Sequence, residues 1–176
     1  MDVVQYPGPV LRRGGKKVES FGPDLSRLAE QMLETMYSSK GVGLAAPQVG
    51  VELDLLVFNP SGDPEDRSGE RVLVNPELLE RKGKEFGEEG CLSFPGLYAD
   101  VERAVTVAIR FQDLQGAVHE ERLTDFVARI VQHEIDHLRG VLFVDRLSSV
   151  EKLRVRTRLL EMEERVPAPS RGQARA

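Results

Sequence analysis

The sequence predicts a single domain in which helices and antiparallel strands share one core. At 176 residues the chain is long enough for one such domain, and its apolar residues are spread evenly along it. Apolar residues at helical spacing come first, a region of short apolar runs follows, and helical spacing then returns. The runs are joined by turns rich in Gly, Asp, Ser and Pro, which is typical of hairpins.

The N-terminal region is expected to be extended and to lead into an amphipathic helix. Pro7 and Pro9 disfavour a helix in the first twenty residues. Asp24 is the candidate N-cap of the helix, and Gly41 follows its end. The apolar residues that recur every three or four positions, and so form its core face, are Leu25, Leu28, Ala29, Met32, Leu33 and Met36.

Five strands are expected after this helix. Their runs are residues 51–58, 72–74, 77–88, 104–111 and 117–123. The first two pair across an exposed loop, 59–71, and the last two form a hairpin around the turn 113–116. The charged, glycine-spaced third run is expected to be an edge strand with turns. His119, in the last run, is expected to be exposed.

A C-terminal helix is predicted to complete the domain. It should run from about Ser148, which can form a capping box with Glu151, to about Arg165. The domain would then span residues 1–165. Residues 166–176 consist mostly of Ala, Pro, Ser, Gly, Gln and Arg, and are expected to be disordered because they cannot bury a core.

The helix after the second hairpin carries the main chemical motif. Thr124 or Asp125 can cap its start, and Gly140 ends it. Phe126 and Ile130 form an apolar stripe on the side of the motif. The motif reads Gln132-His133-Glu134-Ile135-Asp136-His137.

Two histidines of this motif have the spacing of metal ligands. His133 and His137 lie one helical turn apart, so both imidazoles can reach one cation. Glu134 projects about 100° round the helix from His133, which suits a base beside a hydrolytic water. A charged turn on a solvated helix is the alternative, but such a helix has no need of the apolar stripe.

A third ligand is needed, because two histidines alone hold a divalent metal weakly. Cys91, the one cysteine, follows Gly90 and precedes Pro95, which predicts a turn where a thiolate can face a metal. His119 is a weaker rival, because a soft thiolate holds such metals strongly. Two histidines and a cysteine leave one tetrahedral position open, as in catalytic sites. A buried thiol without chemistry is the alternative for Cys91.

Composition limits the class of protein. Lys and Arg number 24 against 29 Asp and Glu, and the net charge of −5 disfavours broad nucleic-acid coating, so direct DNA binding is not expected. No apolar run has the length of a membrane span and residues 1–10 lack a secretory signal, so we expect a cytoplasmic protein without membrane contact. A local basic group near the end is either a solvated helix face or a docking face: Lys152, Arg154, Arg156 and Arg158.

Three segments together resemble the signature motifs of the peptide deformylase family, in the family's order. They are GVGLAAPQ at 41–48, EGCLS at 89–93 and QHEIDHLRG at 132–140. The resemblance covers about residues 1–165 and implies an α+β fold with antiparallel strands around a central metal-binding helix and a C-terminal helix. It implies a hydrolase that processes the N-termini of proteins during their biosynthesis. Such an enzyme removes the formyl group from formyl-methionyl nascent chains and releases formate. The metal would most often be Fe²⁺, and the ligand set also suits Zn²⁺, Ni²⁺ or Co²⁺.

The resemblance also implies roles for individual residues. Glu134 would be the general acid/base, and the Gln48 amide and the Leu92 backbone N–H would bind the developing oxyanion. The implied metal ligands are Cys91, His133 and His137. The implied substrate-binding residues are Val42, Gly43 and Gly90 along the peptide backbone and Ile130 in the methionine pocket.

Residues around these motifs add further expectations. Glu89 and Asp136 are candidate carboxylates for orienting a ligand imidazole, with Arg103 as a partner. Tyr98 stands where well-known members of the family often have an arginine, which bears on substrate preference beyond methionine.

Two other classes remain open on the residues alone. A zinc endopeptidase would share the helical motif but usually takes its third ligand downstream, where this chain has glutamates and no histidine after His137. A metal-stabilised binding module would need a fourth protein ligand, and Gln48 and Glu134 would then have no functional role.

Overall fold

The computed structural model describes residues 1–164 and confirms the mixture of helices and strands. The helices are α1 (Pro23–Ser38), α2 (Asp125–Leu138) and α3 (Ser149–Glu164). The strands are β1 (Gly43–Ala45), β2 (Leu55–Phe58), β3 (Arg71–Lys82), β4 (Glu85–Cys91), β5 (Phe94–Arg103), β6 (Thr106–Gln112) and β7 (Val118–Thr124). Short 3-10 helices occur at Pro9–Arg12, Ala46–Val49, Arg67–Gly69 and Phe143–Arg146. The tail expected to be disordered, 166–176, lies outside the described residues.

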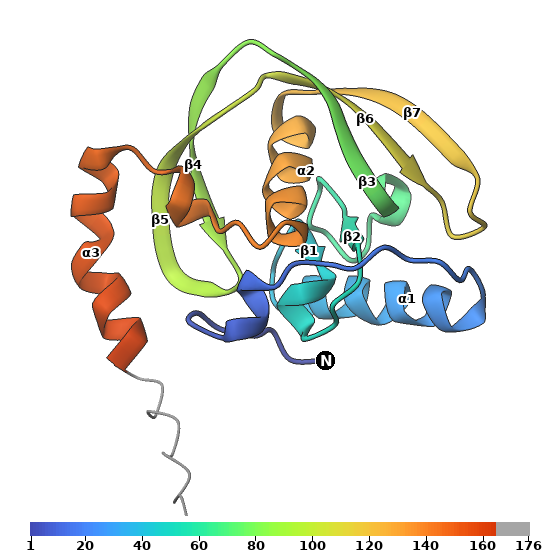
Figure 1. Ribbon diagram of the computed structural model, residues 1–176, viewed down its shortest axis with the longest axis horizontal. Helices are drawn as coiled ribbons and strands as arrows, with labels where there is room; N and C mark the ends of the chain where they lie inside the picture. Colours follow the sequence, from blue (N-terminus) through green and yellow to red (C-terminus); the bar gives the residue numbers. More distant parts are fainter. Residues whose placement is uncertain (165–176) are drawn as a thin grey trace, which may run out of the picture.

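The strands form two antiparallel sheets with α2 between them. The larger sheet has the strand order β1-β2-β3-β6-β7, and the smaller sheet pairs β4 with β5. Figure 1 shows α2 between the two sheets, α1 beside the β1–β2 end of the larger sheet, and α3 outside β5. The fold is therefore a single α+β domain around a central helix, as predicted. None of the described helices has the length and apolar character needed to cross a membrane.

Buried apolar side chains hold these layers together. The apolar face of α1 packs against β1 and β2, and α2 packs against the larger sheet. A third cluster joins β5 to α3 and to the chain that follows α2. Burying one leucine of these clusters contributes about 1.5–3 kcal/mol. Together the clusters fix α2 firmly, and α2 carries the central motif.

The third expected strand, residues 77–88, is divided between two strands, β3 and β4. Residues 77–82 continue β3 past the end of β2 and pair with β6 alone, so this part is an edge, as expected. The chain then turns at Gly83, whose φ of 69° favours glycine, and enters β4. Because β4 belongs to the smaller sheet, this turn carries the chain from one side of α2 to the other.

Local expectations at the helix ends needed correction. Gly22 precedes α1, and Pro23 is its first residue, so Asp24 lies in the first turn and is not the cap. Thr124 precedes α2 without a side-chain capping bond. Ser148 does cap α3, because its hydroxyl accepts a bond of 3.2 Å from the Glu151 N–H. The lead-in is not wholly extended either, since residues 9–12 form a 3-10 turn.

Candidate metal centre

A strand and a helix bring three metal-binding side chains together. Cys91 is the last residue of β4, and His133 and His137 lie on α2. One ligand atom of each lies within 4.8 Å of the others, and the Cys91 sulfur is 3.3 Å from Nε2 of His137. Cys91 was expected within a turn, but it ends the strand, and Leu92 and Ser93 form the turn.

The donor set fits a divalent metal ion. One thiolate and two imidazoles suit iron, cobalt, nickel and zinc. Burial and the neighbouring charge of His133 hold the pKa of His137 well below its usual range, so His137 is neutral, the form that binds metals. Among the described residues Nδ1 of His137 has no hydrogen-bond partner. The three residues could therefore hold a metal ion with a further coordination position open to the cavity.

His119, the rival ligand, is elsewhere. It lies on β7, is exposed, and its Nε2 is 2.7 Å from Asp113. Its position confirms the expectation of an exposed strand residue and removes it from the metal centre.

A buried carboxylate orients the first histidine of the motif. Oε2 of Glu89 is 2.9 Å from Nδ1 of His133, which leaves the other ring nitrogen available to a metal. Burial by itself raises the pKa of Glu89, but hydrogen bonds from His133 and Arg103 outweigh it and lower that pKa to about 2. Glu89 therefore stays charged and fixes the orientation of the His133 ring, as expected from the sequence.

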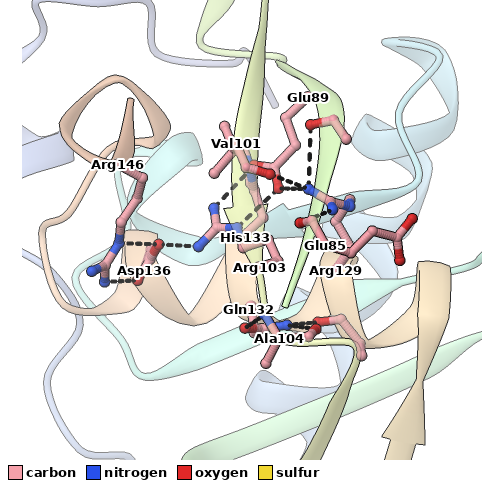
Figure 2. A network of polar contacts seen from close by, with 12 residues as sticks. Glu85, Glu89, Val101, Arg103, Ala104, Arg129, Gln132, His133, Asp136 and Arg146 are labelled. Atoms are coloured by element: carbon pink, nitrogen blue, oxygen red, sulfur yellow. Dashed lines mark hydrogen bonds and ion pairs between the residues drawn. The ribbon is translucent and has the colours of Figure 1, made fainter. Parts of the chain in front are cut away.

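Asp136 has a different role from the one expected. It binds Nη1 of Arg103 at 2.5 Å and accepts two bonds from Arg146, at 3.0 and 2.6 Å, and it does not contact an imidazole. Arg103 in turn donates to both oxygens of Glu89, at 2.9 and 3.0 Å. Figure 2 shows this chain of charges running from Arg146 to His133. Asp136 thus acts on the histidine only through Arg103 and Glu89.

The metal-binding group opens onto a cavity of about 650 Å³. The cavity brings together residues from β1, β4, α2 and the segments between them. The residues expected to act on substrate that line it are Val42, Gly43, Gln48, Gly90, Leu92, Ile130 and Glu134. The residues singled out by the sequence therefore share one site, and exposed Tyr98 and Phe126 also line the cavity.

The Gln48 side chain is held in one orientation. Its Oε1 accepts a hydrogen bond of 2.8 Å from the Ala45 N–H. Its Nε2 then lies 3.5 Å from the Cys91 sulfur and 3.4 Å from the Ser93 hydroxyl. Because the oxygen is engaged by the backbone, the amide N–H₂ group is the part directed toward the metal-binding residues.

Glu134 is buried with its charge only partly compensated. Burial raises the pKa of Glu134 to about 7, although the charge of His133 acts in the opposite direction. Among residues 1–164 its Oε2 has no hydrogen-bond partner. A Cβ on Gly43 would come within 2.5 Å of Oε1, so the carboxylate packs directly on the backbone of β1. Such a group can accept and return a proton near neutral pH.

Arg129 is a residue of the site that sequence reasoning missed. It lines the cavity, and its side chain is 13% exposed. Its position one turn before His133, on the same helix face, was the available signal. Its four acceptors include three backbone carbonyls, which leave no mark in a sequence.

Comparisons with known proteins agree on one family. The model of the family described as polypeptide deformylase matches residues 1–153. A peptide deformylase of Alkalilimnicola ehrlichii is 46% identical over 159 residues, which cover 90% of this chain and 88% of that protein. Peptide deformylase 1B, chloroplastic/mitochondrial, of Arabidopsis thaliana is 41% identical over 182 residues, and the match covers 99% of this chain but 66% of the longer relative. The crystal structure of peptide deformylase from Plasmodium falciparum superposes with a TM-score of 0.90 at 40% identity, covering 93% of this chain and 95% of that one.

Proposed function

The chain belongs to the polypeptide deformylase family, a family of metallohydrolases, and from that premise we infer that it removes the N-terminal formyl group from formyl-methionyl nascent polypeptides and releases formate. The observation that carries this inference is the meeting of Cys91, His133 and His137 with Glu134 in one cavity. A zinc endopeptidase is not favoured, because the third candidate ligand comes from an upstream strand. A closed structural site is not favoured either, because the described group offers three such ligands and a cavity beside them.

In the proposed reaction Cys91, His133 and His137 hold the metal. A divalent ion held there supplies Lewis-acid activation of water, which makes hydroxide available near neutral pH. We propose Fe²⁺ as the native ion, and Zn²⁺, Ni²⁺ or Co²⁺ fit the same donors. Glu89 supports the site by fixing the imidazole of His133.

Glu134 is the proposed general acid/base. It accepts a proton from the attacking water, whose oxygen forms a new bond to the formyl carbon. The carbon–nitrogen bond then breaks, Glu134 returns a proton to the departing amine, and formate leaves. The pKa near 7 of this buried carboxyl suits both transfers.

Two donors are proposed to stabilise the oxyanion that forms during attack. One is the amide N–H₂ of Gln48, whose orientation is set by the Ala45 N–H. The other is the backbone N–H of Leu92 in the turn after Cys91. Losing one donor of this kind typically raises a barrier by about 3–4 kcal/mol.

The peptide is proposed to lie extended between two strand edges. β1 is an edge strand of the larger sheet; Gly43 is its first residue, and Val42 precedes it. Gly90, on β4, faces the same cavity. Extended peptides bind open strand edges through main-chain hydrogen bonds. The methionine side chain would then enter the apolar part of the cavity beside Ile130, which is buried.

The proposal extends to where the enzyme meets its substrate. We propose a cytoplasmic enzyme, and a transient contact with the ribosome through α3 would place it beside nascent chains. Lys152 and Arg156 lie one turn apart on α3 and are exposed. Arg154 and Arg158 lie on another side of the helix and pair with glutamates, so the four basic residues form two pairs and not one face.

A formate-release assay tests the main proposal. Protein prepared without oxygen and loaded with ferrous ion is given a formyl-methionyl peptide and, in parallel, the same peptide with an acetyl group. We expect formate from the first and no cleavage of the second. Formate release no greater than that of ferrous ion alone would contradict the deformylase proposal, and cleavage of an internal peptide bond would favour the endopeptidase.

A further inference from the structure

The metal-binding residues come from two layers, and the position of one layer relative to the other must be fixed. Cys91 ends β4, and within residues 1–164 the strand β4 pairs only with β5. His133 and His137 lie on α2, which packs against the other sheet. The distance between the thiolate and the imidazoles therefore depends on whatever ties the β4–β5 sheet to α2.

Besides the Glu89–His133 and Arg103–Asp136 contacts, Arg129 ties this sheet to α2 with four hydrogen bonds. From α2, Nη1 donates to Gly87 O at 3.3 Å, to Val101 O at 3.0 Å and to Oε1 of Glu89 at 2.9 Å. Nη2 donates to Glu85 O at 3.0 Å. Figure 2 shows the Arg129 guanidinium beside Glu85 and Glu89 of β4 and Val101 of β5. One side chain of the metal-binding helix thus contacts both strands of the smaller sheet and the carboxylate that orients His133.

The chain leaves space for this guanidinium. A Cβ on Gly87 would come within 2.9 Å of the Arg129 Cζ, so a side chain at this position would displace the guanidinium group. Lysine could not replace the contact set, because its three donors radiate from one atom and cannot span acceptors on two strands. The guanidinium of Arg103 also binds both oxygens of Glu89, so Arg129 is not its only counter-charge.

We propose that Arg129 is a positioning residue that fixes β4 against α2 and so sets the spacing between Cys91 and the two histidines. The inference rests on the metal site of the proposed function. It assigns to Arg129 control over metal affinity and over the cysteine–metal bond, which a residue that only stabilised the fold would not have. It acts through the backbone of β4 and through Glu89, and it does not touch the metal.

Cobalt-loaded protein provides the test, because a thiolate-to-cobalt absorption band reports on the bond to Cys91. The variants are Arg129→Gln, Arg129→Lys and Gly87→Ala, the last of which keeps the arginine but displaces it. Arg122→Gln is the matched control, because Arg122 is an exposed arginine that pairs with Glu80 away from the site. For each protein we measure the Co²⁺ dissociation constant by chelator competition, the absorption spectrum, the melting temperature, and kcat and KM at saturating metal.

We expect Arg129→Gln and Gly87→Ala to raise the Co²⁺ dissociation constant about 10–100-fold, the usual effect of losing a residue that supports metal ligands, and to shift the thiolate band. The dissociation constant of Arg129→Lys should lie between those of Arg129→Gln and the wild type, and that of Arg122→Gln should equal that of the wild type. An unchanged dissociation constant and spectrum in both Arg129→Gln and Gly87→Ala, even with a lower melting temperature, would overturn the proposal. Failure of the wild-type protein to bind cobalt at all would instead overturn the metal site itself.

Discussion

The Glu134 carboxylate lies in a setting that keeps it reactive. It is buried on α2, one oxygen packs on the Gly43 backbone, and the other has no hydrogen-bond partner within the described residues. A buried carboxylate without full compensation binds its proton more tightly, which explains the pKa of about 7. Glycine at residue 43 is therefore needed for the close approach of this side chain, and not for an unusual backbone angle.

Glu134→Gln separates the role of a base from the role of a ligand. The amide keeps the shape of the side chain but cannot take a proton. We expect metal content near that of the wild type and a deformylation rate lower by about 10²–10⁴, the usual worth of general acid–base catalysis. Metal analysis and formate release measure the two quantities, with Glu120→Gln on the exposed strand β7 as control. Loss of metal together with the carboxylate would show that Glu134 is a ligand.

Oxygen sensitivity is expected to depend on the metal beside Cys91. A ferrous ion reacts with oxygen, and an adjacent thiolate can be oxidised stepwise to sulfenic and sulfinic acid, whereas zinc has no redox step. We therefore expect the iron-loaded protein to lose activity in air much faster than nickel- or zinc-loaded protein. Peptide mass spectra should show oxygen atoms added at Cys91 in step with the loss. Inactivation with Cys91 still a free thiol after metal removal would point to loss of oxidised iron instead.

The metal-ligand histidines, which have a regular spacing, could be predicted from the sequence. Arg129, which binds mostly backbone groups, could not. The i and i+4 spacing of His133 and His137 requires only a helix, and the sequence predicted that helix. Glu89 was foreseen as a partner of an imidazole, and Arg103 as a partner of these carboxylates. Asp136 was wrongly expected to orient an imidazole as well, and its bonds to Arg146 were not foreseen. The acceptors of Arg129 are carbonyl groups, which every residue carries.

At the scale of elements, the helices and hairpins were predictable, and the division into two sheets was not. Apolar spacing located α1 and α2 to within a few residues, and the β6–β7 hairpin follows its turn residues. The charged run from 77 to 88 looked like one strand, because alternation along a strand does not reveal which sheet it joins. Only the path of the chain around α2 separates β3 from β4.

The helix α3 offers a test of ribosome docking at the same scale. Lys152→Glu with Arg156→Glu reverses two exposed charges, and among the described residues neither side chain has an ion pair to lose. We expect weaker, salt-dependent association with ribosomes and unchanged turnover of short formyl peptides. The matched control reverses Arg154 and Arg158, which are already paired with glutamates. Ribosome binding equal to that of the wild type at low salt would contradict docking through this side of α3.

At the scale of the whole molecule, the central helix α2 contacts both sheets within residues 1–164. The larger sheet packs its apolar face on α2, whereas the smaller sheet meets α2 through Glu89, Arg103 and Arg129. The second contact is therefore largely polar and lies beside the cavity. Buried ion pairs of this kind add little net stability over apolar packing, but they fix geometry. A metal ion held between Cys91 and the histidines would join the same two layers directly.

Metal binding should therefore stabilise the whole fold, and the gain should depend on Cys91. A ligand that binds only the folded state at 100 times its dissociation constant contributes about 2.7 kcal/mol. Since 1 kcal/mol shifts the melting temperature of a chain this long by about 2–4 °C, zinc at that excess should raise it by roughly 5–11 °C over chelator-treated protein. Differential scanning calorimetry of wild type and Cys91→Ala, each with zinc and with chelator, measures the gain. We expect Cys91→Ala to lose most of it, because two histidines of one helix cannot join the layers. An equal gain in both proteins would show that the stabilising metal binds elsewhere.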